Sequence, residues 1–193
     1  MKNIVVFCGS SPGYDPVYME QARLLGATLA QRNIGLVYGG AKVGLMGAVA
    51  DGALQAGGQV HGVLPRFLQE KELAHTGLTT LLLVDTMHER KTKMNELADG
   101  VIALPGGFGT MEELFEMLTW GQLGLHKKPI ALLNINGFYD ALNQLSQTMT
   151  DQGFLSAPNR SMLLCSNSID DLLTQMENYK APEKDKWLTK EKT

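Results

Sequence analysis

The segment with the residue types best suited to chemistry is Leu-Pro-Gly-Gly-Phe-Gly-Thr-Met-Glu-Glu, at residues 104–113. Gly106, Gly107 and Gly109 stand between an apolar run and a helical pattern, so backbone N–H groups at a helix N-terminus can bind an anion there. Glu112 and Glu113 follow directly. An anion site that also needs carboxylates suits a reaction in which positive charge develops near a phosphate. Glycosidic cleavage of a nucleotide has this requirement, because its transition state resembles an oxocarbenium ion.

Other interpretations of this segment can be weighed from its spacing. Thr110-x-x-Glu113 matches a capping box, so Glu113 can instead serve to cap the helix. Glu112 stands where a dinucleotide-binding fingerprint requires glycine, which argues against NAD or FAD. No glycine-rich stretch continues into Gly-Lys-Ser or Gly-Lys-Thr, which argues against an ATPase phosphate loop.

A second segment, at residues 85–94, brings a cation onto an apolar helix face. Thr86 and Glu89 have the spacing of a capping box, which predicts that a helix begins there. Arg90 falls between Met87 and Met94 on the apolar side of this helix. An inward guanidinium must reach water, form an ion pair, or clamp a phosphate or carboxylate. These alternatives stay open from the sequence alone.

A third glycine-rich segment is Tyr-Gly-Gly-Ala-Lys-Val-Gly-Leu-Met-Gly, at residues 38–47. Gly39 and Gly40 can make room for a ligand beside the backbone. Gly44 and Gly47 are explained at least as well by close packing of a helix on a sheet.

The elements that must position these segments alternate along the chain. Short apolar runs predict strands at residues 4–7, 35–38, 60–64, 81–84, 101–104, 129–133 and 162–165. Helical patterns lie between them, at residues 16–31, 45–56, 86–98, from the glycine segment to about 121, 139–151 and 169–179. This order predicts an α/β fold, a Rossmann-like, doubly wound and mostly parallel sheet with helices on both faces. All three glycine-rich stretches then meet at the carboxyl edge of the strands, where such folds bind ligands.

The chain length fits one domain over residues 1–180, followed by a flexible tail at 181–193. Residues 66–80 predict a short helix and a loop that can act as a lid beside the strand ends. The net charge of −3 argues against nucleic acid, and the short apolar run at the N-terminus argues against a membrane span. Two cysteines with no metal-ligand spacing fit a cytoplasmic protein.

The combination of these motifs resembles the Lonely Guy family of cytokinin riboside 5′-monophosphate phosphoribohydrolases, formerly labelled lysine decarboxylases. The resemblance is carried by Arg90-Lys91 after Met-His, and by Pro-Gly-Gly-x-Gly-Thr-x-x-Glu at residues 105–113. It extends over nearly the whole domain, including Cys-Gly-Ser at 8–10, Tyr-Gly-Gly at 38–40, Thr-Trp at 119–120 and Gln-Leu-Gly at 122–124. The decarboxylase label does not fit, because no lysine has a recognisable pyridoxal-phosphate context.

The resemblance implies a Rossmann-like fold, a homodimer or higher homo-oligomer, and no metal or organic cofactor. It implies that Arg90 and Glu113 are the catalytic pair. The nucleotide contacts that it implies are Gly106, Gly107, Gly109, Thr110, Glu112, Lys91, Thr119, Gly40, Ser10 and Glu72. The expected partner is a small-molecule nucleotide. Two rivals remain: a carrier of a phosphorylated ligand similar to the molybdenum-cofactor carriers, and a nucleotide nucleosidase of broad specificity.

Overall fold

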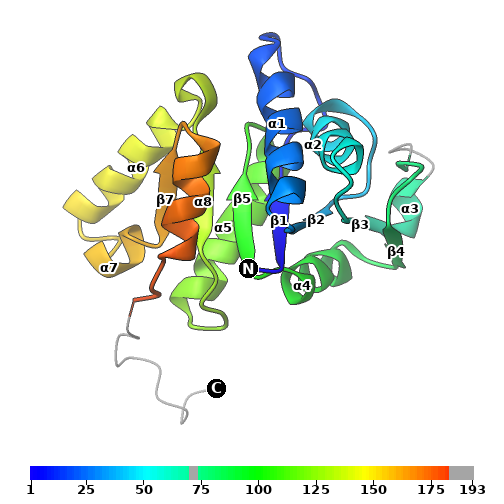
Figure 1. Ribbon diagram of the computed structural model, residues 1–193. Coiled ribbons are helices and arrows are strands. Elements are labelled where there is room, and N and C mark those ends of the chain that lie inside the picture. The colour runs from blue at the N-terminus through cyan, green and yellow to red at the C-terminus, as the bar shows by residue number, and fades with distance from the viewer. Residues whose placement is uncertain (70–73, 183–193) are drawn as a thin grey trace.

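A parallel β-sheet runs through the centre of the computed structural model, which describes residues 1–69 and 74–182 (Figure 1). Seven strands occur in the order β4-β3-β2-β1-β5-β6-β7, and every neighbouring pair is parallel. They are β1 (Asn3–Phe7), β2 (Gly35–Tyr38), β3 (Val60–Pro65), β4 (Thr80–Val84), β5 (Gly100–Ala103), β6 (Ile130–Leu133) and β7 (Leu163–Ser166). The prediction of a doubly wound α/β fold is therefore confirmed.

Helices cover both faces of this sheet, as continuously apolar strands require. One face is packed by α1 (Val17–Gln31), α2 (Gly44–Gln55) and α8 (Ile169–Glu177), and the other by α4 (Met87–Leu97), α5 (Phe108–Gln122) and α6 (Asp140–Asp151) (Figure 1). Short helical segments complete the chain: α3 (Arg66–Gln69), α7 (Ala157–Arg160) and the 3₁₀ turn η1 (Ile135–Gly137). The α7 helix and the η1 turn were not predicted from the sequence, because a single turn shows no helical periodicity.

Each central strand sends its side chains alternately to the two apolar cores. Val5 packs on the α4 and α5 side, whereas Ile4 and Val6 pack on the α1 and α2 side. Both cores exclude water almost completely, which fixes the heights of the strands relative to one another. The strand ends, and the loops that leave them, are therefore placed by the packing of the sheet.

The strand order reverses between β1 and β5, which are neighbours in the sheet. Loops from these two strands separate in opposite directions at this point, and open α/β sheets bind ligands in the resulting crevice. Here the loop after β1 is joined to the loop after β5 by a hydrogen bond from the Gly9 N–H to the Pro105 carbonyl, 3.0 Å long. The fold therefore places the Leu-Pro-Gly-Gly segment at the switch point.

Three predictions fall partly or wholly outside the described residues. Glu72 lies in the stretch 70–73, so it is not placed, and the predicted lid at 66–80 is described only on either side of that stretch. Most of the predicted tail, residues 183–193, is likewise outside them. Within the described ranges, no helix is long and apolar enough to cross a membrane.

Candidate active site

The glycine loop, residues 105–109, follows β5 and includes the first residues of helix α5. Helix α5 begins at Phe108, and its N-cap is Gly107 with an extended backbone. Gly106 packs so tightly against the Thr110 side chain that a Cβ atom there would collide with Thr110 Oγ1. By contrast, Cβ atoms at Gly107 and Gly109 would meet nothing within 4 Å. Gly106 is therefore explained by packing, whereas Gly107 and Gly109 leave the space beside the helix N-terminus open.

The start of α5 tests the capping interpretation of Glu113. Since Gly107 is the N-cap, Thr110 is the third residue of the helix and Glu113 lies in its second turn. No side chain caps this helix end. The capping-box interpretation of Thr110 and Glu113 is therefore wrong. At the start of α4 the same pattern is confirmed, because the Glu89 N–H donates to Thr86 Oγ1 over 3.0 Å.

Arg90 is a buried cation on the first turns of α4. Its side chain is 8% exposed, and Nη2 lies 4.0 Å from Oε1 of Glu113, whose side chain is 12% exposed. The Arg90 Nε atom is buried and has no hydrogen-bond partner among the described residues. The ion-pair alternative for Arg90 is thus confirmed, and a ligand can still use the remaining donor capacity of the guanidinium.

Gly39 provides the space in which the Arg90 guanidinium lies. A Cβ atom at Gly39 would collide with Arg90 Nη2 and with the Met46 methyl group. The end of β2 therefore forms one wall of the Arg90 site, although it is 51 positions away in the sequence, from residue 39 to residue 90. The glycine pair predicted room for a ligand from its sequence, and the arginine was not anticipated.

The position of Gly40 is fixed by its backbone conformation and by a hydrogen bond. Its φ of +85° is in the left-handed region, and its carbonyl accepts a hydrogen bond from the His75 N–H over 2.9 Å. His75 is held in turn by Asp51, with Nε2 3.1 Å from Oδ1. The hydrogen bond from His75 to Gly40 ties the chain after residue 73 to the carboxyl end of β2.

Cys8, at the end of β1, lies within the electrostatic influence of the Arg90 and Glu113 charges. Burial raises the pKa of the Cys8 thiol far above its ordinary value, the negative charge of Glu113 raises it further, and Arg90 opposes both. The thiol is therefore protonated. Cys8 was assigned no role from the sequence, where its position after an apolar strand was the available signal.

Ser10 and Thr119, two of the predicted nucleotide contacts, lie in different surroundings. Ser10 is exposed and lines a pocket of about 340 Å³ together with Gly9, Gly106 and Gly107, so it lies at the glycine loop. Thr119 lies nine residues beyond Thr110 on α5, which is about 13 Å along a helix axis. Its hydroxyl donates to the Phe115 carbonyl over 2.8 Å, on an exposed face.

Lys91 and Glu112 contact each other. The Lys91 Nζ atom is 2.6 Å from Glu112 Oε1 and 3.0 Å from Oε1 of Glu116, a residue that sequence analysis did not single out. Burial tends to lower the pKa of Lys91, but the hydrogen bonds with Glu112 and Glu116 outweigh it and raise this pKa above its ordinary value. Lys91 is therefore a firmly charged bridge between α4 and α5.

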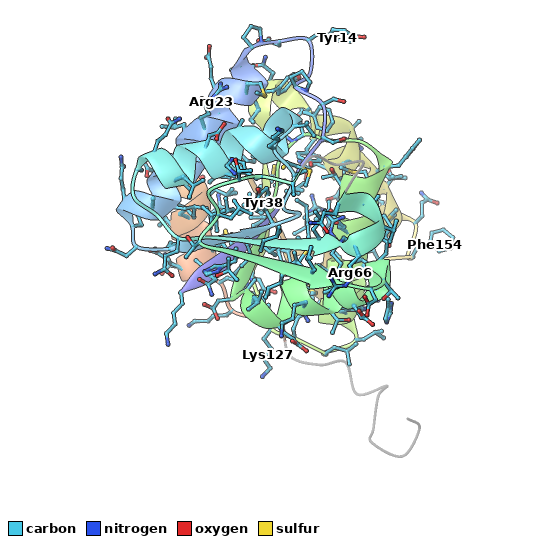
Figure 2. The ribbon with its side chains drawn as sticks, turned by 90° about the vertical axis from the view of Figure 1, so that its right-hand side faces the viewer. Tyr14, Arg23, Tyr38, Arg66, Lys127 and Phe154 are labelled. Atoms are coloured by element: carbon cyan, nitrogen blue, oxygen red, sulfur yellow. The ribbon has the colours of Figure 1, made fainter. Side chains whose placement is uncertain are left out.

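The glycine loop is also held in place by a buried side chain that bonds the residue before it. The buried Tyr139 hydroxyl donates to the Leu104 carbonyl over 2.6 Å, one residue before the glycine loop. The end of β2 is anchored in the interior as well, where Tyr38 lies under α2 while Tyr14 projects from the loop before α1 (Figure 2).

Among the described residues, no group of three His, Cys, Asp or Glu side chains could hold a metal ion.

Comparison with known proteins gives a consistent result. The family model described as "possible lysine decarboxylase" matches residues 46–176. The chain is 42% identical to cytokinin riboside 5′-monophosphate phosphoribohydrolase LOG2 of Arabidopsis thaliana, covering 98% of this chain and 88% of that protein. It is 45% identical to the cytokinin riboside 5′-monophosphate phosphoribohydrolase of Rhodococcoides fascians, covering 92% of this chain and 90% of that protein.

Among solved structures, the molybdenum cofactor binding protein of Rippkaea orientalis has a TM-score of 0.69 and 21% identity, and the match covers 92% of this chain and 96% of that one. Similarity at that level shows a shared fold. The enzyme relatives are twice as similar in sequence and match nearly the full length. On the family match and on these relatives, this chain belongs to the Lonely Guy family.

Proposed function

We propose that this protein hydrolyses the N-glycosidic bond of a purine nucleoside 5′-monophosphate, giving the free base and ribose 5-phosphate. The relatives with 42–45% identity are named as phosphoribohydrolases of such nucleotides. The observation that carries the proposal is the buried pair Arg90 and Glu113, separated by 4.0 Å beside an open helix N-terminus. An anion site, a carboxylate and a cation with spare donors are what this reaction needs.

The phosphate is proposed to bind at the start of α5. The first N–H groups of a helix have no intrahelical partner, and the helix dipole favours negative charge there. The N–H groups of Gly107, Gly109 and Thr110 are at these positions. The open space at Gly107 and Gly109 lets phosphate oxygens approach the backbone. Ser10 and Gly40, at the ends of neighbouring strands, are proposed to border the same nucleotide.

The sugar is proposed to lie between the loop and the Arg90–Glu113 pair. As the bond from C1′ to the base nitrogen breaks, the sugar acquires positive charge, which the Glu113 carboxylate stabilises. Glu113 also orients the water whose oxygen bonds to C1′, and a proton from that water ends on the base. Arg90 binds the sugar phosphate or neutralises the negative charge that develops on the departing base.

The test is direct. Purified protein is incubated with AMP and with N6-isopentenyladenosine monophosphate, and free base and ribose 5-phosphate are measured. Release of both products supports the proposal, whereas equilibrium binding of AMP without release would replace it with a carrier function. Similar rates on AMP, GMP and pyrimidine nucleotides would indicate a nucleosidase of broad specificity. A strong preference for the prenylated nucleotide would indicate cytokinin activation.

We further propose a homodimer that uses the exposed face of α5. Phe108 is 97% exposed, and Phe115 and Leu123 are also exposed on this helix. Thr119 lies on the same helix about 13 Å from the glycine loop, so it would contact the nucleotide bound to a second copy. Light scattering tests this assignment, because Phe115→Asp should convert a dimer to a monomer and reduce activity.

A further inference from the structure

Three charged side chains beside the proposed catalytic pair form a cluster that we name the Lys91 clamp: Lys91, Glu112 and Glu116. Lys91 is on α4, and the two glutamates are one turn apart on α5. The Lys91 Nζ atom lies 2.6 Å from Glu112 Oε1 and 3.0 Å from Glu116 Oε1. A single ammonium group thus joins two helices through two successive turns of α5.

Burial distinguishes this clamp from an ordinary surface ion pair. The Lys91 side chain is 15% exposed and that of Glu116 is 21% exposed, whereas that of Glu112 is 55% exposed, so the buried part of the clamp is the Lys91–Glu116 contact. Lys93 and Glu96, which follow Lys91 on α4, are 44% and 57% exposed in their own pair. Exposed pairs of that kind contribute little, whereas a largely buried pair holds its partners in a defined geometry. The raised pKa of Lys91 agrees with a strongly bound ammonium group.

The charge of the cluster argues against Lys91 as a phosphate ligand. One ammonium and two carboxylates sum to a net charge of −1, and the adjacent Arg90–Glu113 pair adds none. A phosphate dianion approaching Lys91 would also approach both carboxylates, and like charges at such distances repel. The helix N-terminus at Gly107 offers the dianion a better site.

The clamp instead determines where the catalytic pair lies. Arg90 precedes Lys91 on α4, and Glu113 lies between Glu112 and Glu116 on α5. The same two helices therefore carry both ion pairs, and the clamp sets the spacing across which Arg90 faces Glu113. We propose that Lys91 and Glu116 are positioning residues that hold Arg90 against Glu113. This assignment rests on the proposed function for its kinetic consequences.

A double-mutant cycle tests the assignment on the full chain. Lys91→Met, Glu116→Gln and the double variant are compared with wild type on AMP, and Lys93→Met serves as the matched control. We expect each single variant to lose about tenfold in kcat with KM changed less than about twofold, because misplacing catalytic groups lowers kcat. The double variant should be no worse than Lys91→Met, because replacing Lys91 already removes its contact with Glu116. Lys91→Arg should restore most of the rate.

Two results of this cycle would overturn the clamp assignment. If Glu116→Gln keeps the wild-type kcat while Lys91→Met raises KM for AMP, then Lys91 contacts the nucleotide and the clamp assignment is overturned. Additive losses in the double variant would also overturn it.

A second measurement separates this inference from the proposed function. Amide hydrogen exchange in the first turns of α4 should accelerate in Lys91→Met and Glu116→Gln and stay unchanged in Lys93→Met. This result does not depend on turnover. If wild-type protein releases no ribose 5-phosphate, the proposed function fails, while unchanged exchange in Glu116→Gln would by itself reject the clamp.

Discussion

Arg90 Nη2 and Glu113 Oε1 face each other at 4.0 Å, and both side chains are nearly excluded from solvent. This distance is longer than a hydrogen bond, so the guanidinium is attracted to the carboxylate without being saturated by it. A buried guanidinium with spare donors is costly unless something else binds it. The Arg90 guanidinium therefore keeps donor capacity that the proposed substrate can use.

Glu113→Gln should fold normally and lose at least about a hundredfold in kcat, because a neutral amide cannot stabilise the positive charge at C1′. Ribose 5-phosphate release and the melting temperature are measured together. Glu96→Gln, on the surface of α4, is the control and should leave both unchanged. A variant with the wild-type rate and a lower melting temperature would show that Glu113 is only structural.

Gly107→Ala and Gly109→Ala should each remain as stable as wild type and bind AMP much more weakly. Apart from chain neighbours and the helix's own backbone, their Cβ atoms would meet nothing within 4 Å, and the new methyl group would lie beside the proposed phosphate site. Titration calorimetry with AMP and urea unfolding give the two quantities.

The matched control is Gly106→Ala, whose Cβ would collide with Thr110 Oγ1 and approach the Gly9 nitrogen. This variant should lose stability as well as activity. Unchanged AMP affinity in both Gly107→Ala and Gly109→Ala would show that the phosphate binds elsewhere.

Much of the site could be predicted from the sequence, for physical reasons that differ from residue to residue. Arg90 was placed inward because the apolar period of α4 includes it, and the structure confirms this burial. The capping role considered for Glu113 could be excluded only with the structure, because Gly107 and Thr110 are both acceptable N-caps by residue type. Helix boundaries of this kind depend on which residue the sheet places at the turn.

Contacts between distant elements could not be predicted. Glu116 meets Lys91 only because α4 and α5 pack side by side with a particular rotation, which apolar periodicity leaves undefined. The wall that Gly39 forms against Arg90 depends likewise on the height of β2 in the sheet. Thr119, which family resemblance implies as a nucleotide contact, is far from the glycine loop within one chain.

Tyr139→Phe should lower the free energy of unfolding by about 1 to 2 kcal/mol, because it leaves the buried Leu104 carbonyl without its donor. The bond is 2.6 Å long and lies one residue before the glycine loop, so KM for AMP should rise as well. Tyr14→Phe, at a fully exposed tyrosine, is the control and should change neither quantity. Unaltered stability in Tyr139→Phe would show that the carbonyl finds another donor.

Cys8→Ala should flatten the loss of stability at alkaline pH. Burial, reinforced by the charge of Glu113, raises the pKa of the Cys8 thiol, so the folded protein keeps this proton while the unfolded chain releases it above about pH 8.5. The unfolded state then binds fewer protons than the folded state, and the free energy of unfolding falls as pH rises, by up to about 1.4 kcal/mol per pH unit. Removing the thiol removes this contribution.

The measurement is urea unfolding at several pH values between 7 and 10.5. Burial also raises the pKa of Tyr38 and of Tyr139, so both proteins should lose stability more steeply above about pH 10. The difference between wild type and Cys8→Ala should therefore develop between about pH 8.5 and pH 10, before the tyrosines contribute. Cys165→Ala leaves the buried thiol in place and serves as the control. Parallel pH profiles for wild type and Cys8→Ala would mean that the Cys8 thiol ionises in the folded protein, and that the site beside Glu113 is open to water.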